Sequence, residues 1–162
     1  IIRLPFILHT SYPHEILHNW WGNGVYVDPR SSNWAEGLTT YLADHLLFEL
    51  KAKGDRYRFQ QLVQYLNYVS SSKDFPLTEF TSRQDMASQA VGYGKMLMLF
   101  HMLRREIGDE AFLQALRKFY RASKFRYANL EDLRKAIIED ITYPRTANII
   151  DIFFIQGLIH AF

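Results

Sequence analysis

Apolar side chains recur at intervals of three and four residues along much of this chain, which is the spacing of one face of an α-helix. The segment 56–71 is the clearest case, with Phe59, Leu62, Val63 and Leu66 on one side. A brief strand and a turn are expected in "VYVDPRSSN". The predicted helices cover residues 11–21, 34–53, 56–71, 83–106, 110–123, 130–140 and 147–160, with a short extended segment at 3–9. The pattern predicts a mainly α fold, a helical bundle with at most one or two short strands.

Residues with strong positional preferences mark the expected helix ends. Ser11 is expected to cap the first helix, and Asn33 or Ser32 the second, which Gly54 is expected to stop. Asp109 is expected to cap the helix that follows it. Asn129 and Asp132 have the spacing of a capping box.

Length and composition exclude several classes of protein. The 162 residues suit one domain or a piece of a larger one, and 48% of them are hydrophobic. The net charge of +2 is spread along the chain, so no basic stripe indicates nucleic-acid binding. There is no cysteine, and the apolar runs are too short to cross a bilayer, so no membrane segment is expected. The apolar ends, "IIRLPFILHT" and "FFIQGLIHAF", suggest a piece of a longer protein, and no compartment is assigned.

The segment "HEILH", residues 14–18, carries the chemistry. Residues four apart on a helix face the same way, so His14 and His18 can bind one metal ion through their imidazoles. Glu15 is turned by about 100° from His14, where it can reach a water on the metal without binding the metal itself. The alternative is a pair of solvated or hydrogen-bonded histidines.

A third ligand candidate lies further along the chain. Catalytic zinc needs three protein ligands and an open position for water. Glu36 follows His18 after seventeen intervening residues and lies in the first turns of the helix predicted at 34–53. Thr40 and Asp44 follow at four-residue steps and are candidate acceptors for the outer N–H groups of the histidines, unless they face solvent or bond locally.

These motifs together resemble the gluzincin zinc aminopeptidases, the family of membrane alanyl-aminopeptidase and the leukotriene-hydrolase aminopeptidase (metallopeptidase family M one). "HEILHNWWGN" and "NWAEGLTTYLAD" are similar to its HExxH and Trp-x-x-Glu-Gly segments, and residues 91–120 to its tyrosine-bearing helix. The resemblance implies a fragment of a thermolysin-like zincin catalytic domain, one domain over 1–162, with zinc-binding helices at 11–53 and a helical remainder at 56–160. It also implies a peptide substrate and further domains in the parent protein.

The resemblance assigns a role to each site residue. His14, His18 and Glu36 would bind one Zn²⁺, and Glu15 would take a proton from the water and pass it to the leaving amine. Tyr93 matches the tyrosine that donates a hydrogen bond to the oxyanion of the tetrahedral intermediate. The expected activity is removal of amino-terminal residues from peptides.

The chain departs from the family pattern at three places. The gap between His18 and Glu36 is one residue shorter than usual, with Trp34 one residue closer to the glutamate. Met96 stands where the family has glycine, which is expected to alter packing near Tyr93. The Gly-x-Met-Glu-Asn element, which binds the amino terminus of the substrate and precedes HExxH, is absent from this sequence.

Two other functions stay open on the sequence. A thermolysin-type endopeptidase shares HExxH and a distant glutamate, and the isolated chain could be an inactive fragment of an enzyme. The remaining histidines, His9, His45, His101 and His160, have no partner at ligand spacing and are expected to be ordinary surface or core residues. The tryptophans at 20, 21 and 34 are expected to pack as an apolar wall beside the metal.

Overall fold

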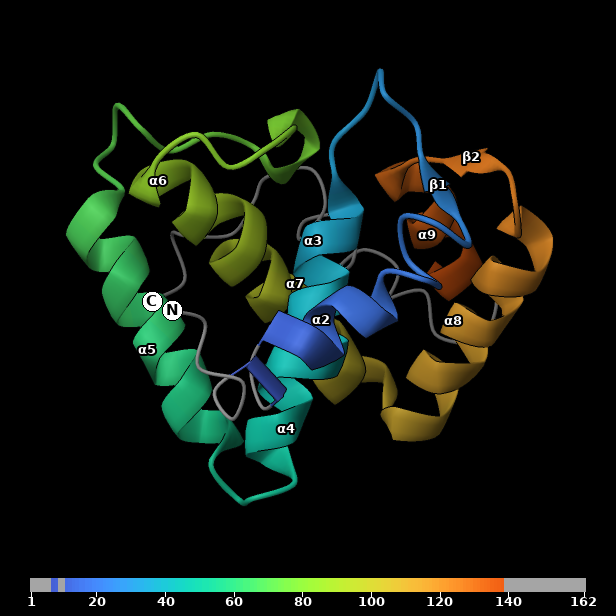
Figure 1. Ribbon diagram of the computed structural model, residues 1–162, viewed down its shortest axis with the longest axis horizontal. Coiled ribbons are helices and arrows are strands. Elements are labelled where there is room, and N and C mark those ends of the chain that lie inside the picture. The colour runs from blue at the N-terminus through green and yellow to red at the C-terminus, as the bar shows by residue number, and fades with distance from the viewer. Residues whose placement is uncertain (1–6, 9–10, 139–162) are drawn as a thin grey trace.

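The computed structural model describes residues 7–8 and 11–138 and is built almost wholly of helices (Figure 1). In chain order these are α2 (Ser11–Leu17), α3 (Trp34–Thr39), η1 (Thr40–His45), α4 (Leu46–Glu49), α5 (Gly54–Tyr68), η2 (Leu77–Glu79), α6 (Met86–Gln89), η3 (Ala90–Lys95), α7 (Met96–Ile107), α8 (Asp109–Ser123) and α9 (Leu130–Ile138). The mainly α prediction is therefore confirmed. The extended segment at 3–9 and the helix at 147–160 fall largely or wholly outside the described residues.

Two long helices contain a π-helical turn. The backbone stays helical from α3 through η1 into α4, and again from α6 through η3 into α7. A π turn widens the helix by one residue and often occurs at functional sites. Here η1 lies just after Glu36, and η3 contains Tyr93.

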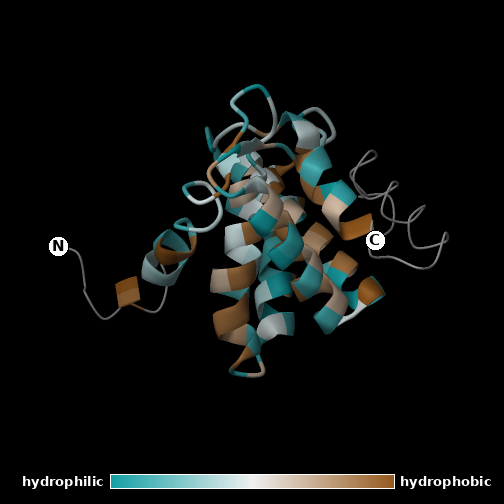
Figure 2. Ribbon diagram, turned by 90° about the vertical axis from the view of Figure 1, so that its right-hand side faces the viewer, coloured by the Kyte–Doolittle hydropathy of each residue, from teal (hydrophilic) through white to brown (hydrophobic). Residues whose placement is uncertain are grey.

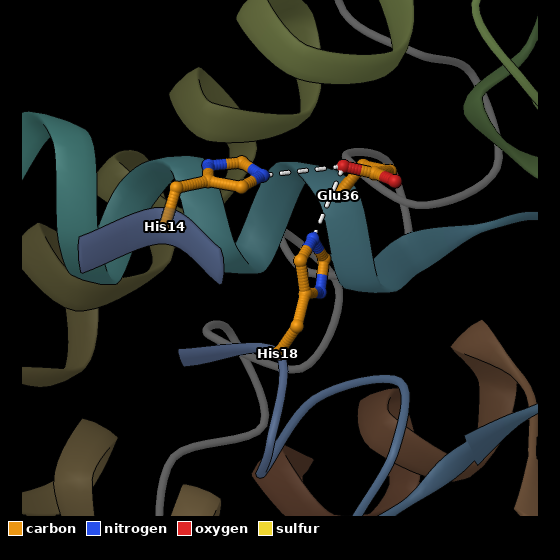
Figure 3. Close-up of side chains that lie close together, drawn as sticks. All are labelled: His14, His18 and Glu36. Atoms are coloured by element: carbon orange, nitrogen blue, oxygen red, sulfur yellow. Dashed lines mark hydrogen bonds and ion pairs between the residues drawn. The ribbon is translucent and has the colours of Figure 1, made fainter. Parts of the chain in front are cut away.

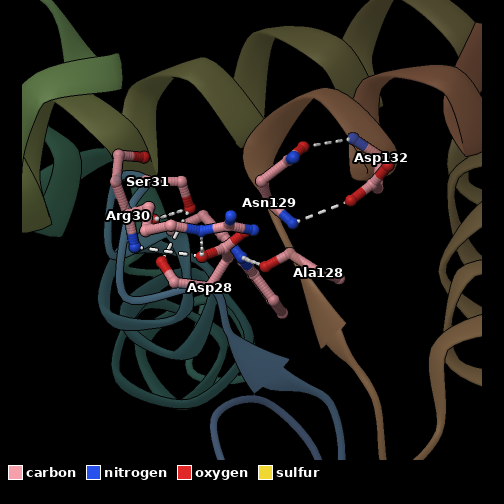
Figure 4. Close-up of polar contacts among 8 residues, drawn as sticks. Asp28, Arg30, Ser31, Ala128, Asn129 and Asp132 are labelled. Atoms are coloured by element: carbon pink, nitrogen blue, oxygen red, sulfur yellow. Dashed lines mark hydrogen bonds and ion pairs between the residues drawn. The ribbon is translucent and has the colours of Figure 1, made fainter.

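A short parallel pair of strands joins two distant parts of the chain (Figures 1 and 4). Strand β1 (Tyr26–Val27) pairs with β2 (Tyr127–Ala128), and the amide of Asp28 donates to the carbonyl of Ala128 at 3.0 Å. Beyond β2, Asn129 and Asp132 bond each other's backbone amides at 2.9 Å, which confirms the predicted capping box.

The core is aromatic and lies between α3, α7, α8 and α9. Trp34 is fully buried and donates from its indole N–H to the carbonyl of Ala128 at 3.0 Å. Its ring packs edge-on against Phe119, and Trp21 stacks on the same phenyl ring. These contacts join the segment after α2, the start of α3 and the end of α8 around one phenyl ring. Among the helices that the structure describes, none is long and apolar enough to span a membrane.

Several predicted helix ends are wrong. Gly54 does not stop a helix; the chain leaves α4 after Glu49, turns through Ala52 in the left-handed region, and Gly54 begins α5. Asn33 precedes α3 but makes no side-chain cap bond. Asp109 is the first residue of α8, and its carboxylate accepts the guanidinium of Arg104. Local capping rules failed where tertiary contacts or a tight turn competed.

Candidate metal centre

Two helices bring the three predicted ligands together (Figure 3). His14 lies in α2, and His18 directly follows that helix, where its amide still donates to the carbonyl of His14 at 3.2 Å. Glu36 lies in the first turn of α3. Figure 3 shows both imidazoles directed at the carboxylate of Glu36.

The distances between the ligand atoms suit a small tetrahedral ion. Oε2 of Glu36 is 3.4 Å from Nε2 of His14 and 3.5 Å from Nε2 of His18. Zinc–nitrogen bonds of 2.0–2.1 Å at the tetrahedral angle place neighbouring ligand atoms about 3.4 Å apart. One ligand atom from each residue lies within 4.8 Å of the others, and among the described residues this is the one such group of three metal-binding side chains. The donor set, two imidazoles and one carboxylate, fits catalytic zinc.

Outer hydrogen bonds hold the two imidazole rings in place. Nδ1 of His14 lies 2.9 Å from Oδ2 of Asp44, and Nδ1 of His18 lies 2.8 Å from the carbonyl oxygen of Trp21. A carbonyl and an ionised carboxylate only accept, so each Nδ1 carries the hydrogen and each Nε2 is left to face Glu36. The expectation for Asp44 is thus confirmed. Thr40 instead bonds locally, because its hydroxyl donates to the carbonyl of Glu36 at 2.7 Å.

The charges around the histidines favour a cation at this point. Burial opposes protonation of His14, but its hydrogen bonds to Asp44 and Glu36 outweigh burial and raise its pKa to about 9. The hydrogen bond to Glu36 likewise raises the pKa of His18. Burial works against ionisation of Glu36, yet its bonds to both histidines hold its pKa far below the usual range. A divalent ion can take the place of these protons, as metal sites do.

A cleft of about 540 Å³ opens onto the three ligands, a volume typical of ligand sites. Glu15 lines this cleft from α2 and Tyr93 from η3, so all five predicted site residues border one space. The ring of Tyr93 lies nearly parallel to that of His14, with 6.4 Å between ring centroids. Burial, together with the negative charge of Glu36, raises the pKa of Tyr93 to about 12, so the hydroxyl keeps its proton at neutral pH.

The sequence interpretation missed other residues of the cleft. These are Ser11, Phe48, Tyr57, Arg83 and Gln89. Gln89 stands four residues before Tyr93 on the same helix, a spacing that could have identified it. Arg83 precedes the helix in a loop and has no local pattern that marks it.

Met96 accounts for one departure from the family pattern. It is fully buried, and a Cβ added at Gly37 would overlap its side chain, so α3 and α7 approach each other closely at this pair. Met96 therefore packs directly against the residue that follows Glu36. The thioether fills the space that the absence of a side chain at Gly37 provides.

The tryptophans do not wall the metal site as expected. Trp21 and Trp34 belong to the aromatic core, Trp20 is 46% exposed, and none of them lines the cleft. His45 is fully buried and His101 is partly buried, with ring centroids 5.7 Å apart, and neither belongs to the metal-binding group. His9 and His160 fall outside the described residues.

Several known proteins are similar to this chain. The domain model of peptidase family M1 matches residues 10–154. Two curated relatives come from Saccharomyces cerevisiae: Aminopeptidase 2, mitochondrial, is 26% identical over 133 residues (78% of this chain), and Alanine/arginine aminopeptidase is 26% identical over 123 residues (72% of this chain). The chain spans 14% of the length of each.

Solved structures with the same fold come from Deinococcus radiodurans. The crystal structure of a mutant M1 zinc metallopeptidase superposes with a TM-score of 0.71 at 20% identity, covering 90% of this chain and 33% of that chain. The same mutant bound to a Tyr-Ser-Ala substrate gives a TM-score of 0.70 at 21% identity, covering 91% of this chain and 33% of that chain. At these identities the likeness shows a shared fold.

Proposed function

The chain belongs to peptidase family M1, and from this membership and the geometry of the cleft we propose that it forms part of the catalytic domain of a zinc-dependent aminopeptidase. The single observation that carries the proposal is the convergence of His14, His18 and Glu36, at 3.4 and 3.5 Å, in a cleft that Glu15 and Tyr93 also line. A pair of hydrogen-bonded histidines without a metal would not require all five of these residues to border one cleft.

The protein side of the zinc site follows from the contacts. Nε2 of His14, Nε2 of His18 and Oε2 of Glu36 would hold one ion, while Asp44 and the carbonyl of Trp21 keep the rings oriented. When bound, zinc supplies Lewis-acid polarisation of the scissile carbonyl and of a water molecule. The fit rests on donor type and on spacing.

Two side chains then move or hold protons. Glu15 is exposed on α2 at the edge of the cleft, where its carboxylate can accept a proton from the attacking water and return it to the leaving amine. Tyr93 donates a hydrogen bond to the oxygen that gains negative charge in the transition state. Its pKa of about 12 suits this role, because the group must donate and stay protonated.

Further segments of the parent protein are part of this proposal. Tyr12, Ile16 and Trp20 follow at four-residue steps along α2 and its C-terminal continuation, and each is more than 40% exposed. Figure 2 shows α2 at the edge of the helical body, with hydrophobic as well as hydrophilic residues on its surface. A metal-bearing helix with such an apolar stripe supports a site that other parts of the protein complete.

The test of catalysis is a Glu15→Gln substitution in the full-length protein that contains this chain. We expect zinc content to stay unchanged and hydrolysis of peptides to fall by about 10²- to 10⁴-fold, because the amide cannot accept the proton. Hydrolysis at the unsubstituted rate would remove Glu15 from the proton-transfer role.

A matched pair of substrates separates the aminopeptidase from a thermolysin-type endopeptidase. The names of the two yeast relatives favour the aminopeptidase. We expect a peptide with a free amino terminus to be cleaved and its amino-acetylated counterpart to resist. Equal cleavage of both peptides would support the endopeptidase. If zinc-loaded protein cleaves neither peptide, the protein is inactive as a peptidase.

A further inference from the structure

Part of the cleft is lined by hydrogen-bond donors that come from a single stretch of chain. Arg83 precedes α6, Gln89 ends α6, and Tyr93 lies in η3. The other charged groups of the cleft are the carboxylates of Glu15, Glu36 and Asp44 and the histidines His14 and His18, whose pKa values are raised. Of the described residues that line the cleft, Arg83 is the one arginine or lysine.

The guanidinium of Arg83 has no partner in the part of the chain that the structure describes, unlike the carboxylates of the cleft that pair with histidine. Within residues 11–138 its side chain forms no hydrogen bond and no ion pair, although Asp44 and Glu36 both pair with histidine. Arg83 therefore borders the cleft with its guanidinium donors unpaired among the described residues.

The backbone that carries Arg83 is fixed by the start of α6. Asp85 caps this helix by accepting the amide of Ser88 at 2.7 Å, and the hydroxyl of Ser88 accepts the amides of Gln84 and Asp85, each at 2.8 Å. Three bonds thus hold the two residues that follow Arg83. An arginine on an anchored turn loses less conformational freedom when it binds a ligand than one on a loose loop.

The electrostatics of the cleft restrict what this arginine can bind. Glu36 and Asp44 are paired with histidines, whereas Arg83 has no carboxylate partner among the described residues, and a guanidinium with free donors can bind a carboxylate with two parallel hydrogen bonds. We propose that Arg83, supported by the amide of Gln89, binds a carboxylate on the leaving-group side of a short peptide substrate, and so selects peptides that carry one. This inference rests on the proposed peptidase function.

Two chemical sources can supply that carboxylate, the carboxyl terminus of a dipeptide or an acidic side chain. Four peptides separate them: Ala-Ala and Ala-Ala-amide differ in the terminus, and Ala-Glu-amide and Ala-Gln-amide differ in the side chain. Binding is measured by calorimetry on zinc-loaded full-length protein with the Glu15→Gln substitution, so that the peptides are not consumed. The comparison is then independent of turnover.

We expect the acidic member of at least one pair to bind on the order of ten- to a hundredfold more tightly than its neutral partner. In the Arg83→Gln variant this ratio should fall close to one, and in Arg83→Lys it should be intermediate, because lysine keeps the charge but loses the two-pronged geometry. Arg126→Gln is the matched control, since Arg126 is exposed and does not line the cleft; its ratio should equal that of the parent.

Ratios near one in the parent for both pairs, or a ratio that survives Arg83→Gln, would overturn the inference. An equal loss in Arg126→Gln would also overturn it, because the preference would then come from overall charge. The peptidase proposal is judged separately, by hydrolysis of Ala-Ala-amide with Glu15 restored. A preference that depends on Arg83 without any hydrolysis would sink the peptidase proposal and leave the carboxylate site standing.

Discussion

Two pairs of histidines in this molecule have similar ring geometry and opposite surroundings. The rings of His14 and His18 lie 4.8 Å apart at 78°, and those of His45 and His101 lie 5.7 Å apart at 63°. The first pair faces the carboxylates of Glu36 and Asp44. The second lies among Arg58, Arg104 and the ring of Tyr41, and Arg58 donates to Nε2 of His45 at 2.7 Å.

The surroundings shift the pKa values of the two histidine pairs in opposite directions. Bonds to carboxylates raise the pKa of His14 to about 9, whereas burial and the nearby Arg58 lower the pKa of His101 to about 4 and lower that of His45 as well. Closeness of two imidazoles therefore does not make a metal site. The ring nitrogens must also meet a third anionic ligand, and acceptors must fix their outer N–H groups.

The largest expected effect is a loss of zinc affinity that occurs in the first histidine pair and not in the second. Losing a group that hydrogen-bonds a metal ligand lowers metal affinity by roughly 10–100-fold. In His14→Ala we expect the zinc affinity to fall by more than this, because a ligand itself is removed. His101→Gln should bind zinc as the parent does. Competition with a chromophoric chelator measures both, and equal affinity of His14→Ala and His101→Gln would erase the distinction between the pairs.

The outer partner of the metal-centre pair should have the next largest effect. Asp44→Asn keeps a hydrogen-bond acceptor for Nδ1 of His14 and removes the negative charge, so zinc affinity should fall by about 10–100-fold. Glu49→Gln is the control, since Glu49 pairs with Arg104 beside the second pair. An unchanged affinity in Asp44→Asn would show that the bond at 2.9 Å contributes nothing to the metal site.

The outer partner of the core pair should act on stability instead. Arg58→Met removes the donor to His45, which is fully buried, and we expect the free energy of unfolding to fall by about 0.5–1.5 kcal/mol. Urea denaturation measures the change, and zinc affinity should not move. Weakened zinc binding in the Arg58→Met variant would mean that the two regions are coupled.

The second pair should also give the stability of the protein a pH dependence, through His101. Its pKa in the folded protein is about 4, below the ordinary value of 6.5, so the unfolded chain binds more protons between these values. Stability should therefore fall as the pH drops from about 6.5 to 4 and level off below. His101→Gln should reduce this slope, as followed by urea midpoints of zinc-loaded protein, and an unchanged slope would contradict the lowered pKa.

The contrast between the pairs also marks how far the sequence could lead. His14 and His18 were identified because four-residue spacing on a helix is a local property, and Glu36 because it opens a strongly periodic helix. Asp44 followed from the same periodicity. The cationic environment of His45 could not be predicted from the sequence. Arg58 donates to His45 from α5, and Gly54, the first residue of α5, was expected to end the preceding helix.

Features set by tertiary packing stayed out of reach. The π turns of η1 and η3 have no local sequence signal here, and Trp21 turned to the core because Phe119, almost a hundred positions away, stacks on it. Arg83 joins the cleft because the continuous helix of α6, η3 and α7 places the loop residue before it at the metal centre. The chemistry was therefore predictable from the motif, while the cleft that receives a substrate was not.

The most direct measurement is diffraction at the zinc absorption edge from a crystal of the full-length protein grown with zinc. We expect one anomalous peak between Nε2 of His14, Nε2 of His18 and Glu36, at about 2.0–2.2 Å from each ligand atom, and none beside His45 and His101. No peak at the first position under saturating zinc, or a peak at the second pair, would contradict the assignment of the metal centre.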